Sequence, residues 1–235
     1  MDSWTGSVRE GFSTVSRLTA PSVRPHHFGD LASLLVGRVH CGGGAAGCAK
    51  KGAPLSPGPD YVIPSAQSGM TLDEVYSYTS MIAIFRSSWW PSGVLSEMTD
   101  LQVKLLTNDD VIRVTMASSG TRQVIDAQSR SFAGPGIVWV SDDDASTQAG
   151  ELKKYVLLVN LAATVSSHGE NYTAPGDDIT RSVGVQFEDL GIPRAHSCDV
   201  SELWNASKMD RASGVLSATL RPHASLFVAL TNCGP

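Results

Sequence analysis

Side chains that could take part in chemistry are spread thinly along this chain. Those that stand close together or border a glycine-rich segment are His26, His27, Asp30, Cys41, Cys48 and the acids Asp142 to Asp144. None of them falls into a G-x-S-x-G nucleophile elbow, an H-E-x-x-H zinc helix, a paired C-x-x-C or a dinucleotide-binding G-x-G-x-x-G. No self-contained active site, no metal site and no cofactor site is therefore predicted from these residues.

The acids Asp142 to Asp144 form the densest acidic cluster. Calcium takes six to eight oxygen ligands at fixed positions, and the neighbouring sequence lacks the glycine and the distal glutamate of an EF-hand loop. We therefore predict a solvated hairpin turn here.

A long surface loop is predicted at residues 39–69, which are rich in Gly and Pro and show no periodicity. Cys41 and Cys48 enclose six residues within it, mostly Gly and Ala, and are predicted to form a disulfide. A zinc site is disfavoured because His40 is the only further ligand nearby. Cys198 and Cys233 lie on or beside candidate strands, and the sequence leaves their pairing open.

Charge and hydropathy exclude several kinds of partner. The net charge of −5 and the absence of a basic run argue against nucleic acid or an anionic membrane as the main partner. No apolar run is long enough to span a bilayer, and the N-terminal MDSWTGSVRE lacks the regions of a signal peptide.

Two helices are predicted in the middle of the chain. Thr71 with Glu74 forms a capping box, followed by a mostly apolar stripe that ends before the break at Ser88 to Gly93. The stripe consists of Leu72, Val75, Tyr78, Thr79, Ile82, Phe85 and Arg86. Thr99 with Gln102 starts the second helix, and Asn108 is placed at a left-handed turn. Its predicted buried residues are Leu101, Leu105, Leu106 and Ile112.

Beyond Val114 the pattern changes to short runs separated by turn residues, which predicts an antiparallel β-sandwich. The predicted strands are Arg122–Ile125, Gly136–Ser141, Lys153–Leu161, Ser182–Phe187, His196–Asp199, Gly214–Leu220 and Ser225–Thr231. Arg221 to Ala224 is predicted to form the last hairpin turn. Trp139, Tyr155 and Trp204 are assigned to the core.

The stretch from Met70 to Ile112 contains Ile84-Phe85-Arg86-Ser87 and, further on, LLTNDDVI. In order and spacing these phrases resemble the last two βα units of the α-galactosidase, or melibiase, family of glycoside hydrolases (family 27). The candidate strands carry further phrases like those of that family's sandwich, at Tyr155–Asn160, Asp189–Ile192, Glu202–Trp204 and Pro222-His223. The resemblance implies a (β/α)8 barrel followed by a C-terminal β-sandwich.

A complete barrel needs about 250 residues. The expected architecture is therefore α/β plus all-β. Residues 1–116 would hold the last two to three βα units of a TIM barrel, and residues 117–235 the antiparallel sandwich. Val8, Phe12, Val15 and Leu18 predict an amphipathic N-terminal helix that Pro21 ends. The Asp2-Ser3-Trp4 phrase before it resembles the phrase that opens the helix after the family's sixth barrel strand.

The resemblance also implies a substrate contact. His26 to Gly37 is similar to the family's H-W-P-D-x-D-M-L-x-x-G phrase, whose second Asp binds sugar hydroxyls. In the ungapped match that Asp falls on Ala32, and only the first acid, Asp30, remains. A methyl group accepts no hydrogen bond, so sugar binding at this strand end should be weakened. A turn or capping role for Asp30 is the alternative.

By the same resemblance the activity would be retaining hydrolysis of terminal α-galactosyl residues. That reaction needs two carboxyl groups about 5 Å apart. The family's K-x-D nucleophile phrase is absent here, and its acid/base Asp would precede Met1. The chain alone is thus expected to be inactive. A non-catalytic carbohydrate-binding sandwich and a degenerate remnant are the alternatives. The sequence does not separate galactose from N-acetylgalactosamine, nor does it give an oligomeric state.

Asn171-Tyr172-Thr173 and Asn205-Ala206-Ser207 are N-glycosylation sequons. Together with four cysteines and a family that is usually secreted or lysosomal, they suggest passage through an oxidising compartment.

Overall fold

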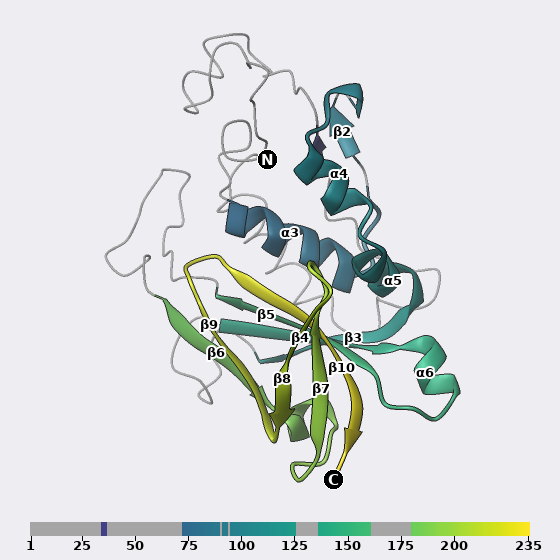
Figure 1. Ribbon diagram of the computed structural model, residues 1–235, viewed down its shortest axis with the longest axis vertical. Coiled ribbons are helices and arrows are strands. Elements are labelled where there is room, and N and C mark those ends of the chain that lie inside the picture. Colours follow the sequence, from purple (N-terminus) through teal and green to yellow (C-terminus); the bar gives the residue numbers. More distant parts are fainter. Residues whose placement is uncertain (1–33, 37–71, 90, 94, 126–135, 161–179) are drawn as a thin grey trace.

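The computed structural model describes residues 34–36, 72–89, 91–93, 95–125, 136–160 and 180–235 (Figure 1). The predicted N-terminal helix, the loop at 39–69 and the cap at Thr71 lie outside these residues. In the part of the chain that is described, no helix is both long and apolar enough to cross a membrane.

An eight-stranded antiparallel sheet forms the lower part of the molecule in Figure 1. Its order along the sheet is β3-β4-β5-β10-β7-β8-β9-β6. The strands are β3 (Ser118–Ile125), β4 (Gly136–Asp143), β5 (Lys154–Asn160), β6 (Arg181–Gln186), β7 (Ser197–Glu202), β8 (Ser207–Ser213), β9 (Val215–Leu220) and β10 (Ser225–Gly234). β8 and β9 share only the pair Ser213 and Val215. The sheet folds over at this point, because apolar side chains of β6 and β9 join those of β4 and β5 in one buried cluster. This confirms the predicted sandwich.

Three central strands are buried on both faces. One face of β4, β5 and β10 packs inside the sandwich, with Val138, Val140, Val156, Leu158, Val228 and Leu230 in its core. The other face carries Ile137, Trp139, Tyr155, Leu157, Val159, Phe227 and Ala229, which belong to a second core. Since successive side chains of a strand point to opposite faces, only continuous apolar runs can fill both cores.

Helices cover the second face (Figure 1). They are α3 (Leu72–Ile84), α4 (Asp100–Leu106) and α5 (Asp109–Ala117). Of the predicted α3 stripe, Val75, Tyr78, Thr79, Ile82 and Phe85 are buried, whereas Leu72 is exposed. The Phe85 ring meets Trp139 edge-on at a centroid distance of 4.3 Å. The helices and the sandwich therefore share one apolar core.

The end of α3 agrees with the predicted break. Arg86 adopts φ 55°, and its N–H donates to the carbonyl of Ala83 while the N–H of Ser87 donates to that of Ile82. This is the paired closure of a Schellman motif, here with Arg in the left-handed position where Gly is usual. The left-handed conformation is unfavourable for Arg. A side-chain hydrogen bond offsets that cost, because Arg86 Nε donates to the carbonyl of Thr115 on α5 at 3.1 Å.

The second predicted helix is in fact two helices. Its start is confirmed, since Thr99 and Gln102 form a complete capping box before α4. Asn108 does not adopt the predicted left-handed conformation: it has φ −73°, and its side chain accepts from the N–H of Val111. It is the N-cap of α5, which is why the helical run restarts there. Leu105 is buried as predicted, while Leu101 and Leu106 are partly buried.

A separate parallel pair consists of β1 (Leu34–Val36) and β2 (Pro91–Gly93), with Leu35 opposite Ser92. α3 lies between them in the sequence, so the order is strand, helix, strand. Parallel neighbours need such a crossover. A 3-10 turn, η2 (Leu95–Glu97), leads on to α4.

All seven predicted strands are present, and most boundaries agree within two residues. The structure adds β8, whose side chains are almost all exposed. It also adds a short helix, α6 (Asp144–Gln148), and a 3-10 turn, η3 (Phe187–Leu190). The predicted turn at Arg221 to Ala224 joins β9 to β10, with His223 at φ 62°.

Candidate functional site

Four of the sequence-predicted site residues, Asp30, Cys41, Cys48 and Asn171, lie outside the described part of the chain. Asn205 is described, in the exposed turn between β7 and β8. Its N–H donates to Glu202 Oε2 at 2.7 Å, and its Oδ1 accepts from Lys104 Nζ at 3.0 Å. The predicted glycan acceptor therefore stands where α4 meets the sandwich.

Several hydrogen bonds join the helices to the sandwich beside the shared apolar core. Asn108 Nδ2 donates to the carbonyls of Leu203 and Trp204, both at 3.1 Å. The indole Nε1 of Trp204 donates to Ser80 Oγ at 2.9 Å. Each buried polar group in this set has its partner on the other side of the contact, so the polar bonds fix how α3 and α5 sit on the sheet.

A second group of polar contacts joins α3 to the turn between β9 and β10. His223 Nδ1 lies 2.6 Å from Glu74 Oε1, and the carbonyl of His223 accepts from Ser77 Oγ at 2.7 Å. Arg221 forms an ion pair with Asp73 at 2.9 Å. Asn160 holds the turn from the sandwich side, since its Nδ2 donates to the carbonyls of Leu220 and Arg221. The phrases that carry the sequence resemblance, including Pro222-His223, thus position the helix on the sheet.

The acidic cluster differs from the predicted solvated turn. Asp143 is only 1% exposed and caps α6, accepting from the N–H of Ser146 at 2.9 Å. Tyr155 donates its hydroxyl to Asp143 at 2.5 Å, and Lys153 Nζ lies 3.5 Å from the same carboxylate. Burial works to raise the pKa of Asp143, but these donors and the Lys153 charge together hold that pKa below its usual value. The cluster is a structural carboxylate site.

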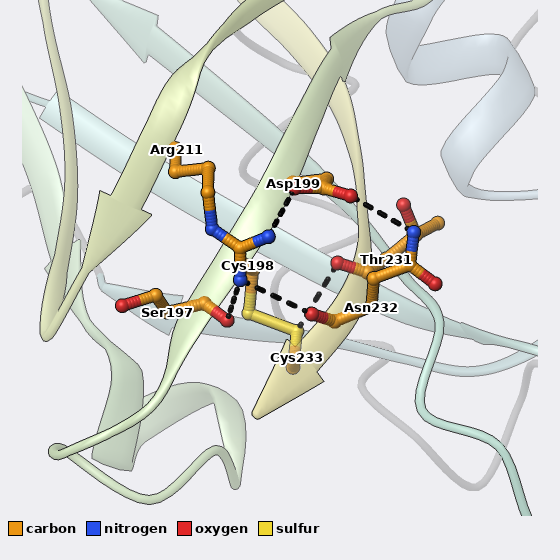
Figure 2. A network of polar contacts seen from close by, with 7 residues as sticks. All are labelled: Ser197, Cys198, Asp199, Arg211, Thr231, Asn232 and Cys233. Atoms are coloured by element: carbon orange, nitrogen blue, oxygen red, sulfur yellow. Dashed lines mark hydrogen bonds and ion pairs between the residues drawn. A yellow bond between two sulfur atoms is a disulfide. The ribbon is translucent and has the colours of Figure 1, made fainter. Parts of the chain in front are cut away.

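A polar network surrounds the only disulfide among the described residues, which joins Cys198 on β7 to Cys233 on β10 (Figure 2). This settles the pairing that the sequence left open. Arg211 on β8 donates to Asp199 Oδ1 at 2.6 Å, and Asn232 Nδ2 donates to Asp199 Oδ2 at 2.8 Å.

In the part of the chain that the structure describes, no group of three or more His, Cys, Asp or Glu side chains could hold a metal ion. No exposed aromatic side chain stands on the described surface either: Trp139, Tyr155 and Trp204 are all at most 5% exposed. Their predicted place in the core is confirmed. What the described residues assemble is a contact surface between helices and sandwich.

Comparison with known proteins decides what kind of sandwich this is. Residues 137–230 match the model of the alpha galactosidase C-terminal beta sandwich domain. Over these residues, from β4 to β10, the chain is similar to that sandwich domain. The sequence resemblance to the C-terminal portion of family 27 glycoside hydrolases is thereby confirmed. No curated protein matches the chain.

Solved structures share the fold. A family 27 β-L-arabinopyranosidase from Geobacillus stearothermophilus is similar over 98% of this chain and 42% of its own, with 21% identity and a TM-score of 0.70. A protein from Bacillus halodurans described as a putative α-N-acetylgalactosaminidase is similar over 98% of this chain and 45% of its own, with 16% identity and a TM-score of 0.67. A protein from Bacteroides fragilis described as a putative α-galactosidase/melibiase is similar over 98% of this chain and 40% of its own, with 16% identity and a TM-score of 0.63. The chain spans about two fifths of the length of these structures.

Proposed function

We propose that this chain is the C-terminal portion of an α-galactosidase-like glycoside hydrolase of the retaining type, whose substrates carry terminal α-galactosyl residues. The observation that carries the proposal is the family match of the sandwich, whose outer sheet face is covered by α3, α4 and α5. The sandwich shares a buried core with these helices, which favours a role beside a neighbouring domain.

Residues 1–116 are then the last two to three βα units of a (β/α)8 barrel, followed by the sandwich at 117–235. The parallel pair of β1 and β2, with α3 between them in the chain, supports this assignment. The likeness to family 27 folds over 98% of this chain supports it as well.

The chemistry of this chain is limited by its carboxylates. Retaining glycosidases use two carboxyl groups about 5 Å apart, one as nucleophile and one as acid/base. The phrases that supply both in the family are missing from this sequence. We infer that the chain alone does not hydrolyse glycosides. Asp30 is left as its candidate sugar contact, with no catalytic residue, no metal and no cofactor.

The test is an assay of the purified chain on aryl α-galactoside, aryl α-N-acetylgalactosaminide and aryl β-L-arabinopyranoside. The expected result is no release of the aryl alcohol above the uncatalysed rate on any of them. Turnover that follows the protein through size-exclusion chromatography would show that catalytic carboxylates exist elsewhere in this chain. If one of the three were turned over, that result would also identify the sugar.

A non-catalytic carbohydrate-binding sandwich and a degenerate remnant are the alternatives. Sugar-binding sandwiches present aromatic rings to the ligand, and the described surface has none exposed. Retention of the wild-type chain on immobilised galactose without any turnover, and unchanged in Asp30→Asn, would favour the binding sandwich, because Asp30 lies outside residues 117–235. Absence of both turnover and retention would favour the remnant.

Secretion or lysosomal targeting belongs to the same proposal. Asn205 stands in an exposed turn, as a glycan acceptor must, and Asn171 is the second proposed acceptor. Cys41 and Cys48 are proposed to form a disulfide. Expression in a secreting eukaryotic host, followed by glycosidase treatment and peptide mass spectrometry, should find glycan at both Asn205 and Asn171. Asn205→Gln should remove one glycan, and a glycan content unchanged by that substitution would refute the acceptor role.

A further inference from the structure

The Cys198–Cys233 disulfide lies between two irregularities in the sheet. The pairing of β7 with β10 shifts register between Thr231 and Gly234, so that Asn232 and Cys233 together stand opposite Cys198. The pairing of β7 with β8 shifts between Cys198 and Val200. Regular ladder bonds are interrupted on both sides of Cys198 and Asp199, so another interaction must hold the chain here.

Arg211 provides that interaction from β8. Its Nη1 donates to Asp199 Oδ1 at 2.6 Å, and its Nη2 donates to the carbonyls of Ser197 at 3.0 Å and Asn232 at 3.4 Å. The other oxygen of Asp199 accepts from Asn232 Nδ2 at 2.8 Å. We call Arg211, Asp199 and Asn232 the clasp; Figure 2 shows how it connects the three strands around the disulfide.

The clasp contacts the bulge that carries Cys233 through hydrogen bonds that are separate from the covalent bond. Asn232 adopts φ 48°, a left-handed conformation that Asn tolerates and that its two clasp contacts favour. Cys233 Sγ lies 3.8 Å from the carbonyl oxygen of Thr231, so a free thiol there has an acceptor within reach. Cys198 is fully buried in the sandwich core, where a thiol packs as a small apolar group.

We propose that Cys198 and Cys233 form a reversible dithiol–disulfide site that opens and closes inside the folded sandwich, with the clasp holding the two sulfurs opposite each other in both states. The reaction partner is a low-molecular-weight thiol such as glutathione. This inference goes beyond the proposed function and does not depend on it.

Opening begins at Cys233, because Cys198 is fully buried and Cys233 is only partly so. A glutathione thiolate attacks Cys233 Sγ and forms a mixed disulfide, while Cys198 leaves as a thiolate and takes up a proton. A second glutathione thiolate attacks the glutathione sulfur, releasing the Cys233 thiolate, which is protonated, and oxidised glutathione. Two electrons pass from two glutathione thiols to the protein disulfide. Closing is the same sequence in reverse, with oxidised glutathione as the oxidant.

The test follows closure in the native chain. The protein is reduced, checked for an unchanged near-ultraviolet circular dichroism spectrum, and mixed with oxidised glutathione. Samples are alkylated at intervals, and peptide mass spectrometry follows Cys198 and Cys233 separately from Cys41 and Cys48. The wild-type pair should re-form from the folded reduced state. Arg211→Ala should lower the equilibrium constant for closure roughly tenfold, since the effective concentration of one sulfur near the other falls.

Lys208→Ala is the matched control, because Lys208 is an exposed cation on the same strand and takes no part in the clasp. Its equilibrium constant for closure should equal that of the wild type. The constant for Arg211→Lys should lie between those of the wild type and Arg211→Ala, since a lysine keeps the charge but loses the forked contacts. If Arg211→Ala does not fold, Asp199→Asn replaces it, and the same loss is expected. Equal closure constants in Arg211→Ala and Lys208→Ala would overturn the proposal, as would unfolding of the sandwich on reduction.

Discussion

Asp143 is a buried carboxylate whose charge is held by three neighbours. The hydroxyl of Tyr155, the N–H of Ser146 and the ammonium group of Lys153 all face it. Burial and the nearby Asp143 charge raise the pKa of Tyr155 well above its ordinary value, while the pKa of Asp143 is lowered. The pair is therefore a neutral tyrosine that donates to an ionised aspartate at all ordinary pH values.

Removing the tyrosine hydroxyl tests this assignment. Tyr155→Phe leaves the Asp143 carboxylate buried without its shortest hydrogen bond, so the free energy of unfolding should fall by about 1–3 kcal/mol. Urea denaturation at pH 7, followed by tryptophan fluorescence, measures the change. Asp144→Asn serves as the control next to the site and should have little effect.

The same pair predicts a dependence on pH. The pKa of Asp143 is lower in the folded protein than in the unfolded chain, where an aspartate has a pKa of about 3.9. Its stabilisation is therefore complete above that pH and is lost as the pH falls through the folded-state pKa. The stability difference between wild type and Tyr155→Phe should be constant from about pH 5 to 7 and shrink below about pH 4. A gap that stayed unchanged down to pH 2.5 would contradict the assignment.

The acidic cluster was visible in the sequence, but the burial of Asp143 and its structural role were not. Three consecutive acids suggest exposure, and their spacing gives no sign that Tyr155, on the next strand, lies against Asp143. Burial of a single carboxylate depends on strand pairing, which local sequence does not encode.

At the scale of elements, the sequence predicted one helix start whose stabilising contacts lie within one helical turn. The Thr99 and Gln102 box predicted the start of α4 because both partners lie within one helical turn. The prediction for Asn108 is wrong although its cap on the N–H of Val111 is local, since Asn is common both at left-handed turns and at helix N-caps. Its bonds to the carbonyls of Leu203 and Trp204 join distant parts of the chain and leave no local signal. β8 was missed because its exposed side chains show no apolar alternation, and it forms by pairing with β7 alone over most of its length.

Asn108 is accordingly predicted to matter more than an ordinary helix cap. Asn108→Ala removes the cap of α5 and leaves two carbonyls of the turn before β8 without their donor, so the free energy of unfolding should fall by about 2–3 kcal/mol. Met116→Ala on the same helix is the control: the side chain is 72% exposed, and the expected change is within about 0.5 kcal/mol. Equal effects of the two substitutions would show that the Asn108 contacts contribute nothing.

Gly136 marks a close approach between the layers of the sandwich. A Cβ atom there would lie 2.9 Å from both Cγ atoms of Val183 on β6. Gly136→Ala should therefore force β4 and β6 apart locally and reduce the free energy of unfolding by about 1–3 kcal/mol. Gly234→Ala is the matched control, since a Cβ there meets nothing within 4 Å. Thermal denaturation of both variants should show a lowered midpoint for Gly136→Ala only.

At the scale of the whole molecule, the sheet has a core on each side. The core shared with α3, α4 and α5 uses Trp139, Leu157 and Phe227 from strands that lie beyond the predicted domain boundary at 116/117. The continuous apolar runs of β4, β5 and β10 were visible in the sequence. The covering of their outer face by helices was not predictable, because the sequence pattern does not say what packs on an apolar face.

Residues 117–235 expressed alone should therefore differ from the full chain. The fragment uncovers the sheet face that α3 buries, so it should bind a hydrophobic dye such as ANS and associate in sedimentation experiments. Adding Ile137→Thr, Leu157→Thr and Phe227→Thr to the fragment makes that face polar and should reduce both effects. A monomeric fragment without dye binding would mean that the sandwich needs no cover.

The bond between Ser77 and the carbonyl of His223 joins residues 146 positions apart, which has a consequence for synthesis of the protein. At about 5–20 residues per second, a ribosome takes roughly 7–30 s to add the residues between them. During that time α3 has left the exit tunnel while β10, on which it packs, does not yet exist. Until the last strand is made, α3 therefore lacks one of the strands against which it packs.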